Sequence, residues 1–211
     1  MSMWLTTPSR NTALAQWPSL TSAGDTTPRL QVPWPDAARG LCQNMRKRVY
    51  IETTIPSFYY EVRSTPDMVA RRAWTRDWWD NQRHHYDLVT SAAVLEELSQ
   101  GNYPSKEQAL ALISHVPLLP TVAAIDAIVE TYIAHYVMPR NSLGDALHLA
   151  LTSYHGCHFL LTWNCIHLAN ANKFEHIRHV NTLLGLYVPI LTTPVELLNW
   201  EGASDDARPS H

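Results

Sequence analysis

Four polar side chains of this sequence have the types and positions that a divalent-cation site requires. Glu52 ends an apolar run typical of a buried strand, and Asn164 closely follows a second such run. Glu97 lies two turns into an expected helix and borders its apolar face. Asp145 lies in the first turn of another expected helix, where the helix dipole favours a carboxylate. Ligands bind beyond the carboxyl ends of parallel strands, so we expect these four residues to converge on one pocket.

The donor atoms of these four side chains define the chemistry. Three carboxylates and one amide oxygen are hard ligands, which suit Mg²⁺ or Mn²⁺ rather than zinc. Such an ion keeps several waters, activates one of them and neutralises a phosphate oxygen, which is the chemistry of phosphodiester hydrolysis. Taken singly, carboxylates at such positions are more often solvated surface or capping residues. The spacing alone therefore leaves both interpretations open.

The elements that would position these side chains alternate between short apolar strands and helices. The expected strands are residues 49–52, 87–90, 158–162 and 188–191. The expected helices are residues 68–84, 91–101, 106–115, 121–136, 142–154, 168–185 and 194–199. Ser105 and Gln108 predict a capping box at the start of the third of these helices. The alternation predicts an α/β fold, a parallel-sheet α/β/α sandwich forming a single domain over residues 46–200.

The first 45 residues differ from the rest in composition. They contain five prolines among many Thr and Ser residues, with no sustained period of 2 or 3.6. We expect residues 1–45 to be a disordered or poorly ordered N-terminal extension and residues 201–211 to be a polar tail. Trp4, Trp17 and Trp34 leave a partner-docking role open for the extension. Met45 precedes a basic flank and the first strand, which indicates that it is the natural start of the protein.

Composition excludes several classes of protein. The chain has 211 residues, of which 45% are hydrophobic and 17% charged, so it can bury a core. It has no apolar run long enough to span a membrane and no secretory signal pattern. Its three cysteines lack C-x-x-C spacing, which fits a reducing cytoplasm. The net charge of −3 gives no global attraction to nucleic acid, so RNA binding would need a local basic patch.

A helix rich in arginine and tryptophan is a candidate for that patch. Arg71, Arg72 and Arg76 are interleaved with Trp74 and Trp78. Arginines and aromatics together can grip single-stranded RNA by phosphate pairing and base stacking. The same pattern also fits tryptophans in the core, or a protein interface, with the arginines on the solvated face. Both interpretations remain open.

Four histidines fall in the second half of the chain without metal-ligand spacing. These are His148, His155, His158 and His167. We expect ordinary hydrogen-bonded side chains, although His148 lies three residues after Asp145 and shares its helix face.

The segments that carry the four site residues resemble PIN-domain nucleases. Residues 49–54 (VYIETT) are similar to the family's opening strand, and residues 91–98 (SAAVLEEL) to the helix that carries its second acid. Residues 144–150 (GDALHLA) resemble the segment with the third acid, and residues 160–164 (LLTWN) the segment with the fourth site residue. The order and spacing agree from about residue 46 to residue 198. Together the segments resemble a PIN domain of the VapC toxin type.

The resemblance implies a metal-dependent endoribonuclease that hydrolyses RNA phosphodiester bonds, and the toxin of a type II toxin–antitoxin pair. Glu52, Glu97 and Asp145 would hold Mg²⁺ or Mn²⁺, with Asn164 as a weak or indirect ligand. The family also implies a homodimer and a cognate antitoxin.

Two further residues and two departures from the family pattern complete these expectations. Thr53 or Thr162 would hydrogen-bond the cluster or a water on the ion. Glu52 replaces the usual Asp, and Asn164 replaces an acid found in many members. Both changes keep open an alternative function, that of a catalytically degraded PIN-like module that binds RNA or a protein partner. A nuclease acting on structured DNA is a weaker alternative, because it would need more positive charge.

Overall fold

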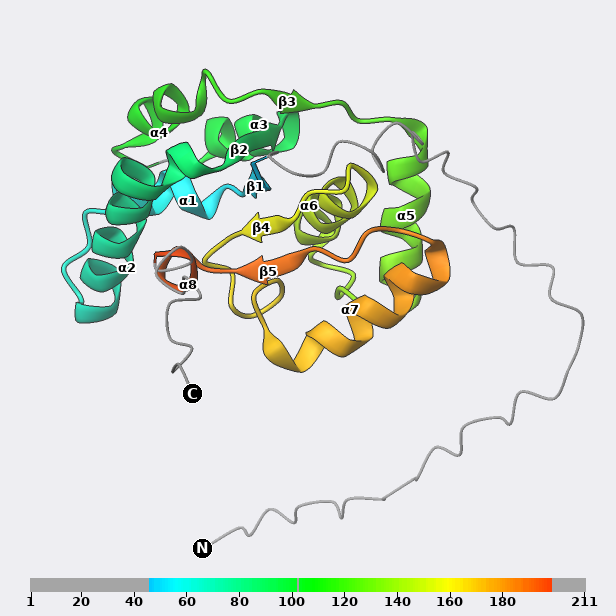
Figure 1. The fold of residues 1–211 in the computed structure, drawn as a ribbon. Helices are drawn as coiled ribbons and strands as arrows, with labels where there is room; N and C mark the ends of the chain where they lie inside the picture. Colours follow the sequence, from blue (N-terminus) through cyan, green and yellow to red (C-terminus); the bar gives the residue numbers. More distant parts are fainter. Residues whose placement is uncertain (1–45, 102, 199–211) are drawn as a thin grey trace, which may run out of the picture.

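A single parallel sheet organises the protein. The computed structural model describes residues 46–101 and 103–198. The strands are β1 (Arg48–Ile51), β2 (Asp87–Ser91), β3 (Leu118–Leu119), β4 (Phe159–Leu161) and β5 (Ile190–Thr192). They lie in the order β3-β2-β1-β4-β5, and every neighbouring pair is parallel (Figure 1). The predicted α/β fold is confirmed, whereas the expected extension and polar tail lie outside the described residues.

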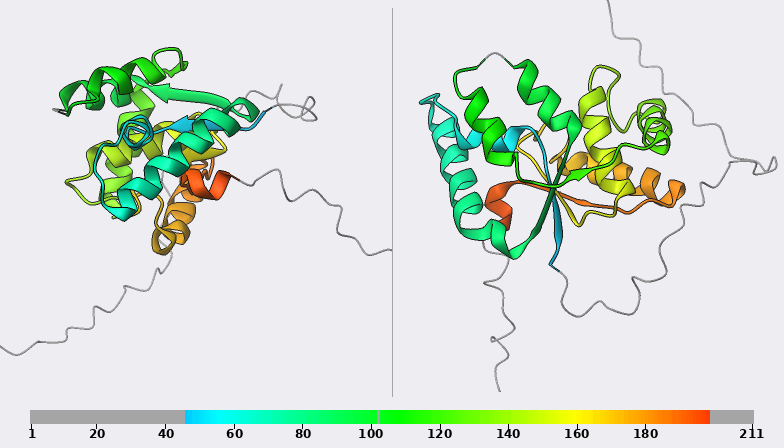
Figure 2. Two further views of the ribbon diagram at one scale, coloured as in Figure 1. Left: turned by 90° about the vertical axis from the view of Figure 1, so that its left-hand side faces the viewer. Right: turned by 90° about the horizontal axis from the view of Figure 1, so that it is seen from above.

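Helices flank this sheet. They are α1 (Thr54–Tyr59), α2 (Pro66–Asp77), α3 (Ala92–Gln100), α4 (Lys106–Ile113), α5 (Ala123–Ala134), α6 (Leu143–Tyr154), α7 (Ala171–Leu184) and α8 (Pro194–Leu197). In Figure 1 the arrows of β4 and β5 point toward the side where α1 and α8 lie, because α1 follows β1 and α8 follows β5. Seen from above, the strands cross at the centre of the molecule with helices around them, as the twist of a sheet requires (Figure 2). Each described helix is too short or too polar to cross a membrane.

The central strand carries the most buried sequence. Val49, Tyr50 and Ile51 of β1 are fully buried. Strand β1 pairs with β2 on one side and β4 on the other, so that Val49 lies opposite both Leu88 and Phe159. A strand covered on both faces needs a continuous apolar run rather than an alternating one, and this is the pattern the sequence has.

Two elements escape the sequence pattern. Strand β3 has only two residues, too few for any period to be visible. Helix α1 contains Pro56, and a proline in a sequence usually indicates that no helix continues through it. Pro56 is the third residue of α1, where its missing N–H has no helical acceptor to lose, so the helix tolerates it.

The predicted capping box at Ser105 is wrong. The Ser105 hydroxyl makes no cap and instead donates to the Tyr60 carbonyl oxygen at 3.0 Å, which ties the start of α4 to the end of α1. A capping box does form at α8, between Thr193 and Glu196. The tertiary contact at Ser105 replaces the local cap that the sequence suggested.

A buried polar junction joins α5, α6 and α7. The Tyr132 hydroxyl donates to Asn181 Oδ1 at 2.5 Å, and Asn181 Nδ2 donates to Ser153 Oγ and to the Tyr187 carbonyl oxygen, both at 2.9 Å. Tyr132, Asn181 and Ser153 are all at most 1% exposed. Each polar atom is therefore paired where water cannot replace a lost partner, and the junction fixes α6 against its neighbours.

This junction makes a prediction for stability. Tyr132→Phe removes the donor and leaves the buried Asn181 Oδ1 without its partner, so we expect the free energy of unfolding to fall by about 1–3 kcal/mol. Urea unfolding followed by circular dichroism measures the change. Tyr136→Phe is the matched control, because Tyr136 is 85% exposed and its substitution should leave stability unchanged. Equal losses in the two variants would contradict this account of the junction.

Candidate metal centre

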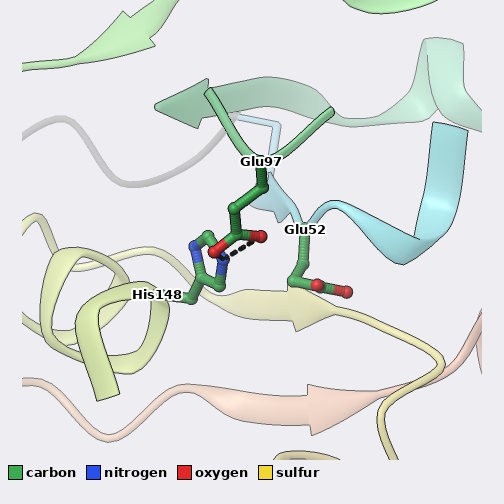
Figure 3. Close-up of side chains that lie close together, drawn as sticks. All are labelled: Glu52, Glu97 and His148. Carbon is green, nitrogen blue, oxygen red and sulfur yellow. Dashed lines mark hydrogen bonds and ion pairs between the residues drawn. The ribbon is translucent and has the colours of Figure 1, made fainter. Parts of the chain in front are cut away.

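Two of the expected site residues, Glu52 and Glu97, meet at the carboxyl edge of the sheet. Glu52 directly follows β1, and Asn164 lies in the loop after β4. Helix α3 begins where β2 ends and brings Glu97 to the same edge, and α6 brings His148 (Figure 3). Ligand atoms of Glu52, Glu97 and His148 all lie within 4.8 Å of one another. Asp145, which is also on α6, lies outside this tight group.

One oxygen of Glu52 is fixed by three hydrogen bonds. Oε2 accepts from the backbone N–H of Thr54 at 3.0 Å, from the Thr54 hydroxyl, and from the Thr162 hydroxyl at 2.7 Å. Each of these two hydroxyls also accepts a backbone N–H from the loop after β4. Trp163 donates to Thr54 Oγ1 at 2.7 Å, and Asn164 donates to Thr162 Oγ1 at 2.8 Å. Glu52 thereby joins the start of α1 to this loop.

The other oxygen of Glu52 has no such partner. Oε1 makes no hydrogen bond with any described residue, although the side chain is only 4% exposed. Burial raises the pKa of Glu52, and it outweighs the opposing effects of His148 and of the hydrogen bonds. Oε1 is not among the buried side-chain atoms that lack a hydrogen-bond partner, so solvent or an ion can reach it. This oxygen fits a cation ligand.

Glu97 is held in a different way. Thr53 Oγ1 donates to Glu97 Oε2 at 2.5 Å, and His148 Nε2 lies 3.2 Å from both carboxylate oxygens. Partial burial opposes ionisation of Glu97, but the hydrogen bonds and charge of His148, with the bond from Thr53, outweigh it and lower its pKa. The ionised form is therefore the favoured state, which is the form that binds a cation.

The buried His148 side chain orients Glu97. The imidazole is 1% exposed, and its Nδ1 lies 2.8 Å from the Tyr50 hydroxyl, which lies 2.7 Å from Ser91 Oγ. Because an ionised carboxylate only accepts hydrogen bonds, His148 Nε2 carries the proton. Burial disfavours the charged imidazolium, but the neighbouring carboxylates outweigh this and raise the pKa of His148. His148 is hydrogen-bonded, as expected, and its partner is the candidate ligand Glu97. In the sequence, its position three residues after Asp145 was the one sign that it lies near the site.

Asp145 and Asn164 form a second part of the site. Asn164 Nδ2 donates to Asp145 Oδ1 at 2.8 Å, and Asn164 Oδ1 accepts the backbone N–H of His167 at 3.1 Å. The amide is thus oriented by its own loop and leaves Asp145 Oδ2 without a hydrogen bond among the described residues. Burial raises the pKa of Asp145 despite the nearby His167 and His148. This geometry assigns Asn164 to orienting Asp145 rather than to binding an ion through its amide oxygen.

The hydrogen bonds expected of the two threonines are both present. Thr53 donates to Glu97 and Thr162 donates to Glu52. Glu52 and Asp145 each keep one oxygen without a hydrogen bond among the described residues, whereas both oxygens of Glu97 contact His148. Carboxylate oxygens are the ligands that Mg²⁺ and Mn²⁺ prefer. The donor chemistry therefore fits the ion that the sequence suggests, with Glu52, Glu97 and Asp145 as the residues that would hold it.

The three arginines considered for RNA contact are engaged within the protein. Arg72 Nη1 donates to the Glu61 carbonyl oxygen and Arg76 Nε to that of Tyr59, both at 2.8 Å. The Arg71 guanidinium lies 5.3 Å from the centre of the Trp163 ring. All three therefore support the packing of α2, and their contact with RNA stays a prediction.

The two tryptophans on this side of the molecule differ in exposure. Trp78 is fully buried, so its core interpretation is confirmed. Trp74 is 39% exposed and stacks on Trp163, with ring centroids 6.1 Å apart. Trp74 is thus only partly committed to the core.

Comparison with known proteins assigns no family. A scan against protein-family models and a search of curated proteins both give no match to the chain.

Gly144 makes the approach of α6 to Glu97 possible. A Cβ added at this residue would lie 2.7 Å from Glu97 Oε1. The Glu97 carboxylate can swing away, so Gly144→Ala should leave the fold intact but move a candidate ligand. We expect Mn²⁺ affinity, measured by isothermal titration calorimetry, to fall about tenfold or more, the scale of losses when a ligand's support is removed.

A second glycine provides the control for this prediction. Gly185 has φ of +67° at the end of α7 and nothing near its Cβ position. Gly185→Ala should lower stability by about 1–2 kcal/mol through backbone strain alone and leave Mn²⁺ affinity unchanged. Unchanged affinity in Gly144→Ala, or a parallel loss in both variants, would contradict the assignment of Glu97 as a ligand.

Proposed function

We propose that residues 46–198 form a PIN-like domain that acts as a Mg²⁺- or Mn²⁺-dependent endoribonuclease, the toxin of a toxin–antitoxin pair acting in the cytoplasm. One observation carries the proposal: Glu52 and Glu97 meet at the carboxyl edge of a parallel sheet, and Glu52 keeps one oxygen free of hydrogen bonds with the described residues. The resemblance of four sequence segments to PIN-domain nucleases supports the substrate class. A homodimer and an antitoxin partner belong to the same proposal.

The residues divide the work between holding charge and fixing geometry. Glu52, Glu97 and Asp145 supply the negative charge that would bind the ion. Thr162 and Thr53 restrict the first two carboxylates, so that little reorganisation is needed when the substrate arrives. When bound, the ion supplies Lewis acidity, which lowers the pKa of water and offsets the charge of a phosphate group.

A second candidate function is a domain that binds RNA or a protein without cutting. Two observations favour it. Asp145 lies outside the tight group, and the Asn164 amide oxygen already accepts a backbone hydrogen bond. Two fixed carboxylates without a third would hold Mg²⁺ weakly. The two candidates differ in whether Asp145 is essential.

Asp145→Asn separates these two candidates. The variant keeps the size of the side chain and removes its charge, so we expect metal-dependent cleavage of a labelled mixed-sequence RNA to fall about a hundredfold or more. Asp126→Asn is the matched control, because Asp126 lies in the first turn of α5 and is exposed. Both are assayed in Mn²⁺, in Mg²⁺ and in EDTA. A folded wild-type chain that does not cut in any condition would favour the non-catalytic domain.

The site should also respond to pH in a defined direction. Burial raises the pKa of both Glu52 and Asp145, so these carboxyls take up protons at a higher pH than the ordinary value of about 4. A protonated carboxyl does not bind a cation. We therefore expect Mn²⁺ affinity to be full above the raised pKa values and to decline as the pH falls through them. Calorimetric titrations from about pH 8 to about pH 4 would show the decline, and constant affinity down to about pH 4 would contradict it.

A further inference from the structure

A cavity of about 300 Å³ lies between the end of α1 and the segment before α4, next to the hydrogen bond from Ser105 to Tyr60. One wall is the end of α1 and the loop that follows it, with Ser57 and residues 60–63. The other is the segment from Tyr103 to Ser105, just before α4. Its volume is at the lower end of small-molecule sites, which start at about 300 Å³. Its lining is mainly aromatic and apolar.

The cavity lies one helical turn from the contact between Thr53 and Glu97. On α1, Ser57 follows Thr53 by one turn, and its hydroxyl donates to the Thr53 carbonyl oxygen at 2.8 Å. On α3, Gly101 follows Glu97 by one turn, and its N–H donates to the Glu97 carbonyl oxygen at 3.3 Å. A helical turn rises about 5.4 Å, so the separation between the cavity and the Thr53–Glu97 contact is about the distance between neighbouring nucleotides.

The Tyr103 ring forms the wall nearest to that contact. A Cβ added at Gly101 would lie 2.5 Å from Tyr103 Cε1, so the ring is in place only because residue 101 has no side chain. The Tyr103 hydroxyl is buried and makes no hydrogen bond with a described residue. It lies near Ser57, whose own proton is donated to Thr53. Because this hydroxyl is buried, the aromatic face is what the wall offers.

The charges of Glu61 and Arg63 cancel at the cavity, so its lining does not repel a polyanion such as RNA. Glu61 accepts from the backbone N–H and from the guanidinium of Arg63, which lowers the pKa of Glu61 to about 2. The Arg63 side chain is 60% exposed. Glu61 is the only acidic residue of the described lining, and it is neutralised there. The rim thus presents an Arg63–Glu61 ion pair and aromatic rings, without net negative charge.

From these contacts, we propose that the cavity binds one base of the RNA substrate, at a nucleotide next to the cleaved bond. Aromatic side chains stack on unpaired bases of single-stranded RNA, and Tyr103 and Tyr60 supply such faces here. Arg63 lies at the rim to contact the neighbouring phosphate. This inference rests on the proposed ribonuclease function and adds to it a site that would select for an unpaired base near the cut.

The test pairs variants of the full chain with RNA oligonucleotides that lack a single base. Affinity is measured by fluorescence anisotropy in Ca²⁺, and cleavage is measured in Mn²⁺. An abasic residue is placed in turn at each position around the cut. For the wild-type chain we expect one adjacent position at which losing the base weakens binding about tenfold, the scale of base–aromatic stacking. Tyr103→Leu should weaken binding of intact RNA by a similar factor and abolish the effect of the missing base.

Tyr103→Phe is the matched variant, because it keeps the ring and removes only a hydroxyl without a partner. It should retain both the affinity and the abasic effect, and circular dichroism should show both variants folded. An abasic effect of equal size in Tyr103→Leu and wild type would overturn the base site, as would the absence of any sensitive position. If metal-dependent cleavage persists in that case, the nuclease proposal stands and only the base site fails. A wild-type chain that neither binds nor cuts RNA would overturn both.

Discussion

The candidate site depends on burying one carboxylate at the end of the central strand. Glu52 leaves water because β1 is covered on both faces, and His148 together with hydrogen bonds from the turn that follows and from the loop after β4 offsets part of that cost. The same bonds hold these two chain segments together, so the hydrogen bonds that stabilise this edge of the sheet also position Glu52. The three bonds to Oε2 leave Oε1 without a hydrogen bond among the described residues.

The second carboxylate is supported from the opposite side by a buried relay. Ser91, Tyr50 and His148 lie on β2, β1 and α6, and each contacts the next before His148 reaches Glu97. A protonated Nε2 facing a carboxylate is a donor and not a metal ligand. The close grouping of Glu52, Glu97 and His148 is therefore better described as two carboxylates, one of which is held by a hydrogen-bond donor. Any ion that enters must compete with His148 for Glu97, which makes the third carboxylate, Asp145, important for affinity.

The sequence pattern predicted most of the fold because the strands and helices are set by local periodicity. It predicted that Glu52 and Glu97 lie close together because parallel strands end at one edge, whereas Asp145 lies outside the tight group. It did not predict that His148 supports Glu97, because that contact joins residues 51 apart and depends on the packing of α6 against the sheet. It also misjudged Ser105, where local capping chemistry competes with the distant Tyr60 carbonyl. Local rules fail here at the points where a side chain is claimed by a distant partner.

Position 52 holds a Glu where the resemblance to PIN-domain nucleases implies an Asp, and the structure offers a physical compensation for this change. The longer side chain of Glu52 accepts hydrogen bonds from the hydroxyls of Thr54 and Thr162 with Oε2, and Oε1 stays without a hydrogen bond among the described residues. A shorter Asp would draw its carboxylate back by about one bond length, roughly 1.5 Å. An Asp at this position would then lose either the hydrogen bonds from Thr54 and Thr162 or the oxygen that is available to an ion. The extra methylene is thus matched by the two threonines that receive it, and the substitution argues less against a working site than its chemistry alone suggests.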